Sequence, residues 1–390
     1  MGHRVILHTS FLFLHNSHFM VFSNLIDSQL ASPSPGLQAF RRLLEPCGVV
    51  ELENRAQRSS ALTRRHFGRT MRLFAPLYLS NECVNNCAYC GFSRDNAIVR
   101  VTLEIEQVAT EARHLVAEGF RNILLVAGEH PKFVSGDYLQ RCITRLKREV
   151  PSISLEVAPM ETSDYLPLVA AGSDGLVVYQ ETYDREVYRE LHTAGPKKDY
   201  DWRLDTPERA HEAGFRRIGI GVLFGLSDWR GEATALAAHL FHLQRVCWTS
   251  QLTVSMPRLR PAAGEFQPRF PFDDRDFTQL LCALRITFPQ IGIVLSTREP
   301  APLRDALAPL GFTMMSAGSH TEPGGYTGQG SDQLHQTVRG RKLESTCSAT
   351  SATEQFAISD ERSSSEIAGM LHTRGLEPVW KDWDAAILSP

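Results

Sequence analysis

Three cysteines stand close together in the run Cys83-Val-Asn-Asn-Cys87-Ala-Tyr-Cys90. Thiolates at this spacing on one loop can converge on a metal centre. A structural zinc site usually closes with four Cys or His ligands, and the sequence places no fourth one nearby. An iron–sulfur cluster held by three cysteines leaves one iron with an open coordination position, which suits a cluster that activates a substrate. The spacing therefore favours an iron–sulfur site, with a zinc site and three buried structural thiols as the alternatives.

The elements that must position this loop alternate between strand-like and helix-like stretches. Eight short apolar or β-branched runs are strand candidates, at residues 73–79, 122–127, 152–158, 175–180, 217–223, 251–256, 292–297 and 312–316. Stretches of helical period lie between them, at residues 103–118, 137–149, 206–213, 232–246, 275–288 and 302–310. Strands separated by helices pair in parallel through right-handed crossovers. The count of eight predicts an α/β fold, a (β/α)8 barrel of the TIM type.

Polar side chains follow six of these strands at the point where each strand ends. They are Cys83, Glu129, Glu181, Arg258, Arg298 and Ser316, after strands one, two, four, six, seven and eight. The carboxyl ends of the strands share one mouth in such a barrel, so we expect the six residues to face a single cavity.

The pattern divides the chain into four parts. They are an N-terminal extension with a helical collar (1–72), the barrel (73–325), a flexible Ser/Thr-rich loop (326–359), and a C-terminal helix and tail that complete the barrel (360–390). Six of the nine residues 345–353 are Ser or Thr, which leaves little to bury and predicts mobility there. We expect the last helix at 360–373 and expect Trp380 and Trp383 to pack back on the barrel.

Composition is that of an ordinary globular protein of the cytoplasm. Lys and Arg number 41 against 44 Asp and Glu, a net charge of −3, which disfavours a role in nucleic-acid or membrane-surface binding through bulk charge. Eight cysteines in 390 residues are too few for a disulfide-stapled scaffold, and five are isolated: Cys47, Cys142, Cys247, Cys282 and Cys347. Residues 5–22 are too short and polar for a membrane span. We interpret them as an irregular extension, with a targeting segment as the alternative and Met20 as a candidate start.

The cysteine triplet resembles the motif of the radical S-adenosylmethionine (SAM) enzymes, C-x3-C-x-Φ-C, with Tyr89 as the aromatic Φ. Over residues 44–384 the chain further resembles 2-iminoacetate synthase, the tyrosine lyase family (ThiH) of thiamine biosynthesis. The segments that carry this likeness are PLYLSN (76–81), CGFS (90–93), LVAGEH (125–130), YQETY (179–183), PRLRP (257–261), STRE (296–299), PGGY (323–326) and VWKDWD (379–384).

The resemblance implies a [4Fe–4S] cluster on Cys83, Cys87 and Cys90 that reductively cleaves SAM to a 5′-deoxyadenosyl radical. The radical then breaks the Cα–Cβ bond of L-tyrosine, giving 2-iminoacetate and p-cresol for the thiazole moiety of thiamine. A thiazole synthase of the ThiG type is implied as a protein partner, and a flavodoxin or ferredoxin as the reductant. No nucleic acid or membrane partner is expected.

The resemblance also implies contacts with SAM. Gly128 and Glu129 are expected at its amino group, because glycine allows close backbone approach and a carboxylate pairs with an ammonium. Tyr89 would border the adenine. Glu181 fits a ribose hydroxyl, and Arg203 fits the SAM carboxylate. An ordinary turn, a helix-cap acid and a surface arginine are the competing interpretations.

Arg298 and Ser316 are our candidates for the carboxylate of an amino acid substrate, because the arginine fork suits bidentate recognition. Arg258 and Arg260 are alternatives for this role or for neutralising the cluster. Two further side chains are candidates to reach the phenol, His130 and Tyr326.

Other functions stay open on the sequence. The hydrogenase maturase that makes carbon monoxide and cyanide from tyrosine carries a second cysteine motif near its C-terminus, whereas here only Cys347 follows Gly318. Relatives that act on tryptophan or in menaquinone and deazaflavin pathways are further alternatives. So is a non-catalytic metal-binding partner of thiazole synthase.

Overall fold

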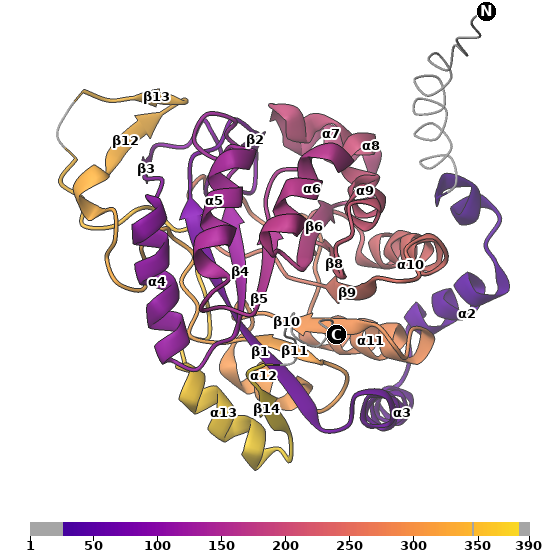
Figure 1. Cartoon of the computed structure of the whole chain (residues 1–390). Coiled ribbons are helices and arrows are strands. Elements are labelled where there is room, and N and C mark those ends of the chain that lie inside the picture. Colours follow the sequence, from indigo (N-terminus) through magenta and orange to yellow (C-terminus); the bar gives the residue numbers. More distant parts are fainter. Residues whose placement is uncertain (1–25, 345–346, 382–390) are drawn as a thin grey trace, which may run out of the picture.

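Eight parallel strands close into a barrel at the centre of the computed structural model, which describes residues 26–344 and 347–381 (Figure 1). They are β1 (Thr70–Ser80), β4 (Asn122–Ala127), β5 (Ser152–Glu156), β6 (Gly175–Glu181), β8 (Arg217–Val222), β9 (Gln251–Ser255), β10 (Gly292–Leu295) and β11 (Met314–Ser316). Each strand pairs with the next in this order, and β11 returns to β1 with Arg72 opposite Met314. All eight lie where the sequence predicts strands, so the (β/α)8 barrel is confirmed.

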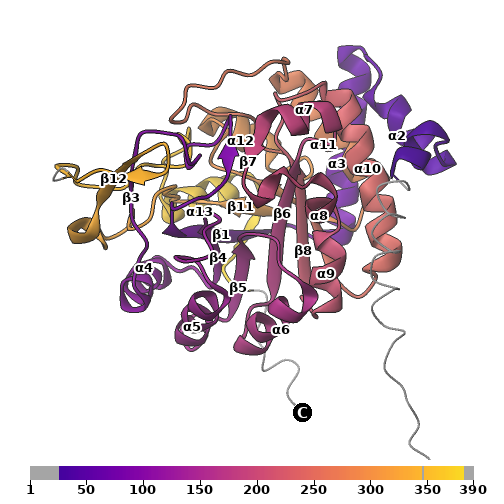
Figure 2. The same ribbon diagram turned by 90° about the horizontal axis from the view of Figure 1, so that it is seen from above.

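Helices cover the outside of the barrel (Figure 2). They are α4 (Ile105–Ala117), α5 (Gly136–Leu146), α6 (Thr162–Ala171), α7 (Arg185–Leu191), α8 (Tyr200–Leu204), α9 (Thr206–Glu212), α10 (Trp229–Val246), α11 (Asp274–Thr287) and α12 (Ala301–Leu307). Periodicity explains the longer ones, since α5 buries Leu139, Cys142, Ile143 and Leu146 on one face. The sequence pattern does not predict α6, α7 and α8. The last two are short, and α6 leaves the apolar Leu166 exposed.

The N-terminal collar consists of α2 (Pro35–Leu44) and α3 (Val49–Phe67), which pack against α10 and α11 (Figure 1). At the other end, α13 (Ser364–Thr373) leads into β14 (Glu377–Val379), which pairs with the start of β1. The Trp380 ring lies 5.5 Å from that of Phe120, as expected, while Trp383 and residues 5–22 lie outside the described residues. In the described ranges, none of the helices combines the length and the apolar character that crossing a membrane requires.

Two small sheets extend from the mouth of the barrel. β2 (Asn86–Cys87) pairs with β7 (His192–Ala194), and β3 (Ile98–Arg100) pairs with β12 (His335–Val338), which also pairs with β13 (Arg341–Lys342). Single 3-10 turns occur at Pro196–Lys198 and Ser331–Gln333. Two of these strands, β12 and β13, lie within the range 326–359 that the sequence predicts to be a flexible loop. The physical reason is that distant parts of the chain supply partners, as when the Gln355 N–H donates to the Thr321 carbonyl at 2.8 Å.

Candidate active site

The three cysteines lie on a loop that leaves the carboxyl end of β1, residues 81–93, here called the cluster loop. The Val84 N–H donates to the Glu129 carbonyl at 2.8 Å, which ties the cluster loop to the end of β4. The buried Arg100 of β3 donates to three carbonyls of the loop. A buried guanidinium without hydrogen-bond acceptors is unfavourable, so Arg100 and the three carbonyls hold one another in place. Arg100 thereby fixes the backbone of the cluster loop.

Gly128 lets the end of β4 approach the cluster loop closely. A Cβ built on Gly128 would lie 2.3 Å from the Glu82 carbonyl oxygen and 3.3 Å from the Cβ of Cys83, so a larger residue would displace the loop backbone. The next residue, Glu129, accepts a hydrogen bond from Asn85 Nδ2 at 2.6 Å. The structure thus brings Gly128 and Glu129 directly against the loop that carries the cysteines.

The number and placement of the three thiols, rather than their acidity, fit a cluster. Burial raises the pKa of all three, and the Lys197 cation opposes this rise at Cys87 and Cys90. Within residues 26–344 and 347–381, no three Cys, His, Asp or Glu side chains form a group that could hold a single metal ion. Each cysteine of a [4Fe–4S] cluster ligates a different iron, so three thiols on one loop, of which Cys87 is buried and the other two are partly exposed, suit a cluster better than one zinc ion.

Glu181 ends β6 in a left-handed backbone conformation with φ of 71°. Its carboxylate is buried and contacts Lys197 Nζ at 2.6 Å and Arg203 Nη2 at 3.8 Å. Burial works against ionisation, but the two cations outweigh it and hold the pKa of Glu181 below its usual range. Arg203 also donates from Nε to the Tyr179 carbonyl at 2.6 Å. Two of the expected SAM contacts, Glu181 and Arg203, therefore belong to one charge cluster.

Tyr89 lies in the same region, between two of the cysteines. Its hydroxyl forms a hydrogen bond with His192 Nε2 at 2.9 Å, and Lys197 Nζ lies 5.7 Å from the centre of its ring. The ring is buried. Tyr89 thus joins the cluster loop to the Glu181 charge cluster.

A cavity inside the mouth of the barrel has two adjoining compartments. The cluster compartment reaches Cys90, Glu181 and Lys197. The inner compartment reaches Ser316 and apolar residues such as Phe74. Five residues line both: Glu156, Tyr179, Arg298, Gln355 and Phe356.

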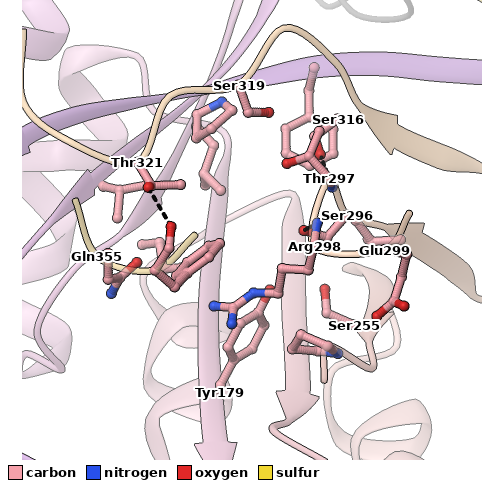
Figure 3. A pocket seen from close by; sticks show the side chains of 18 of the residues that line it. Tyr179, Ser255, Ser296, Thr297, Arg298, Glu299, Ser316, Ser319, Thr321 and Gln355 are labelled. Atoms are coloured by element: carbon pink, nitrogen blue, oxygen red, sulfur yellow. Dashed lines mark hydrogen bonds between the residues drawn. The ribbon is translucent and has the colours of Figure 1, made fainter. Parts of the chain in front are cut away.

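Arg298 and Ser316 face this cavity, as the sequence predicts. Figure 3 shows the Arg298 side chain extending from the end of β10 into the pocket, with Ser316 above it in this view. The guanidinium lies 3.3 Å from the centre of the Phe356 ring, and no carboxylate among the described residues forms an ion pair with it. Ser316 Oγ accepts a hydrogen bond from the Thr297 backbone at 3.1 Å. Arg298 Nη1 donates one long hydrogen bond, 3.5 Å, to the Arg258 carbonyl, and the rest of the fork stays available for a ligand.

The other candidate substrate contacts already have partners within the fold, although Arg260 also lines the cluster compartment. Arg258 pairs with Glu299 and Asp274, and Arg260 donates to Ser359 Oγ. The structure does not bring the two candidates for the phenol to the cavity. His130 Nδ1 accepts from the backbone N–H of residue 132, and the Tyr326 hydroxyl donates to the carbonyl of residue 76 at 2.6 Å.

A segment of residues 353–360, here called the cap, lines both compartments of the cavity through Gln355 and Phe356. Gln355 Oε1 accepts from the Tyr78 hydroxyl at 2.8 Å, and the Gln355 carbonyl accepts from Gly91 of the cluster loop at 3.2 Å. The buried Asp360 pairs with Arg304, which also donates to the Ser316 carbonyl. The cap thus joins the cluster loop to the end of β11.

Sequence reasoning missed Lys197, Glu156 and the cap. Lys197 lies in a short 3-10 turn without periodicity, and only its contact with Glu181 reveals it. Glu156 is the last residue of β5, so the rule that strand ends carry function could have found it. Nothing in the local sequence of the cap indicates where it lies.

Comparison with known proteins agrees with this geometry. Residues 77–237 match the radical SAM superfamily, and residues 255–377 match the biotin and thiamin synthesis associated domain. The chain is 42% identical to 2-iminoacetate synthase of Escherichia coli over 344 residues, 88% of this chain and 86% of the relative. It is 41% identical to that of Salmonella typhimurium over the same shares.

The solved structures include a close neighbour of the whole fold. The X-ray structure of the FeFe-hydrogenase maturase HydG from Carboxydothermus hydrogenoformans superposes with a TM-score of 0.78 at 32% identity, covering 95% of this chain and 81% of that one. The chain therefore belongs to the 2-iminoacetate synthase family of the radical SAM superfamily.

Proposed function

We propose that this chain is a carbon–carbon lyase that cleaves the Cα–Cβ bond of L-tyrosine to 2-iminoacetate and p-cresol. The observation that carries the proposal is its 42% identity to 2-iminoacetate synthase over 88% of the chain. The cysteine triplet at the barrel mouth, beside a cavity that holds an unpaired arginine, supports the same reaction.

The cofactors of this family are a [4Fe–4S] cluster and SAM, which together supply a 5′-deoxyadenosyl radical. Cys83, Cys87 and Cys90 hold the cluster in this proposal. Gly128 and Glu129, which contact the cluster loop, bind the amino group of SAM. Glu181 accepts a hydrogen bond from a ribose hydroxyl of SAM, and Arg203, which contacts Glu181, binds the SAM carboxylate. Tyr89 borders the adenine.

Tyrosine binds in the inner compartment in this proposal, with its carboxylate on Arg298 and Ser316. The compartment offers apolar walls for the ring, including Phe74, Leu124 and Phe277. The cap contributes Gln355 and Phe356 to the walls of both compartments, so it shields part of this space from solvent in the proposal. Positioning of this kind places the reacting bond next to the radical source.

The experiment is product analysis with anaerobically reconstituted, reduced protein, SAM, and an equimolar mixture of tyrosine, tryptophan and phenylalanine. We expect p-cresol and glyoxylate, the hydrolysis product of 2-iminoacetate, in equal amounts, and no tryptophan-derived product. The Cys83→Ala variant is the control for cluster dependence. A tryptophan product, or carbon monoxide and cyanide in place of glyoxylate, would assign the chain to another branch of the superfamily.

Handover of the product is a further part of the proposal. An imine such as 2-iminoacetate hydrolyses in water, so a thiazole synthase bound nearby would capture it first. A flavodoxin or ferredoxin would supply the electron. Adding purified thiazole synthase should lower the glyoxylate yield at constant p-cresol; an unchanged glyoxylate yield would count against direct handover.

A further inference from the structure

Glu156 is a carboxylate at the junction of the two compartments. It ends β5, and its side chain lines both the cluster compartment and the inner compartment, together with Tyr179 and Arg298. The cluster compartment brings Glu181 and Lys197 to the same space. A group in this position faces both the cofactor side and the substrate side of the cavity.

The other two carboxylates that line this cavity are already paired. Glu181 contacts Lys197 and Arg203, and Glu299 contacts Arg258. Glu156 differs, because no hydrogen bond or ion pair joins its carboxylate to any residue in the described part of the chain. Burial and the neighbouring Glu181 carboxylate raise the pKa of Glu156 to about 7, while Arg298 and, more weakly, Arg203 and Lys197 work in the opposite direction.

Arg298 is the matching unpaired cation in the same cavity. The two side chains interact electrostatically, yet they do not form an ion pair with one another. An unpaired buried charge is unfavourable, and both would be satisfied at once by a ligand that carries an anion and a cation close together. An α-amino acid zwitterion is such a ligand. A phenol is neutral and would leave the charge of Glu156 without a counter-ion.

We propose that Glu156 binds the α-ammonium group of the amino acid substrate while Arg298 binds its carboxylate. This inference rests on the proposed function, because it takes an amino acid as the substrate. It makes Glu156 a substrate-binding residue of the cavity, and it leaves the apolar wall of the inner compartment to the aromatic ring.

The test is equilibrium dialysis of three ligands against unreduced holoenzyme with SAM under anaerobic conditions. The ligands are L-tyrosine, L-phenylalanine without the hydroxyl, and 3-(4-hydroxyphenyl)propanoate without the amino group. We expect Glu156→Gln to lower the affinity for the two amino acids by roughly 10- to 100-fold, the range of one charge-assisted hydrogen bond. The affinity for the propanoate should change by no more than about twofold. In the control Glu299→Gln, whose carboxylate is already paired, any change should be shared by all three ligands.

Several outcomes would overturn the inference. An equal loss of affinity for all three ligands would mean that Glu156 only shapes the cavity. Weakening of tyrosine and the propanoate but not phenylalanine would place Glu156 at the phenol, and a selective loss of SAM binding would place it at the cofactor. If Glu156→Gln does not load the cluster, Glu156→Asp, which keeps the charge, should load it and show ammonium-selective binding; failure to do so also overturns the inference.

The proposed function is judged separately, by p-cresol formation in the unaltered protein. When that protein makes p-cresol and Glu156→Gln binds all ligands normally, only the role of Glu156 is refuted. When it makes no p-cresol, the proposed function itself fails.

Discussion

The buried ion pair that anchors the cap offers a test of the fold around the active site. Asp360 and Arg304 are essentially inaccessible to solvent, with side-chain exposures of 1% and 0%. Asp360 also pairs with Arg362 at 2.7 Å, while Arg304 keeps one other acceptor, the Ser316 carbonyl. Asp360→Asn keeps the shape of the side chain but leaves the Arg304 charge without its counter-ion.

The expected loss follows from the burial of this pair. Removing one partner of a buried ion pair costs about 3–5 kcal/mol. The unfolding entropy is about 2.1 cal/mol/K per residue, which for 390 residues is about 0.8 kcal/mol/K. Dividing the two predicts a fall in Tm of about 4–6 °C, measured by differential scanning fluorimetry at pH 7.

The control is Glu106→Gln, which breaks the more exposed pair with Arg145 and should change Tm by less than about 1 °C. Burial opposes ionisation of Asp360, but hydrogen bonds from Arg362 and Arg304 hold its pKa below the usual range. The contribution of Asp360 to the free energy of unfolding is therefore complete above the unfolded pKa of about 3.9. It is lost as the pH falls through the lower pKa of the folded state. The Tm difference should shrink below pH of about 4. A Tm change of less than about 1 °C for Asp360→Asn at pH 7 would refute the reasoning.

Three further predictions concern the active site. Changing any one of the three cluster-loop cysteines to alanine should abolish SAM cleavage, whereas Cys347→Ala should not, as measured by 5′-deoxyadenosine; equal loss from Cys347→Ala would point to a second cluster. Glu129→Gln should weaken SAM binding by roughly 10- to 100-fold in equilibrium dialysis, because it removes the charge that faces the SAM ammonium, and unchanged binding would contradict that role. Arg298→Lys keeps a charge but loses the planar fork, so the ratio of 5′-deoxyadenosine to p-cresol should rise strongly. A normal ratio with near-normal p-cresol would make Arg298 structural.

The barrel could be predicted from the sequence because its signals are local. Apolar runs at β4 and β8 are short, and the amphipathic stretch of α5 has a clear period. The cysteine spacing and the residues at strand ends are local signals too. Arg298 and Ser316 were placed in one cavity by this rule, because parallel strands share a mouth.

The cap and the pairing of charges could not be predicted, because they depend on contacts between distant residues. Arg258 and Arg298 look equivalent in sequence, since each follows a barrel strand. Only the structure reveals that Glu299 neutralises the first and that the second stacks on Phe356. The place of Gln355 next to the Ser/Thr-rich stretch could not be predicted for the same reason, because its partners lie at residues 78 and 321.

The late segments that contact the cluster loop, the cap and His335, also set an order of events during synthesis of the chain. The cluster loop leaves the ribosome early, but His335, which contacts Glu82 at 2.8 Å, and Gln355, which contacts Gly91, come near the end. Until those residues emerge, the thiols lack part of the shell that covers them in the finished fold. A nascent chain therefore presents its cysteines to oxidants and free metal ions before it can shield them.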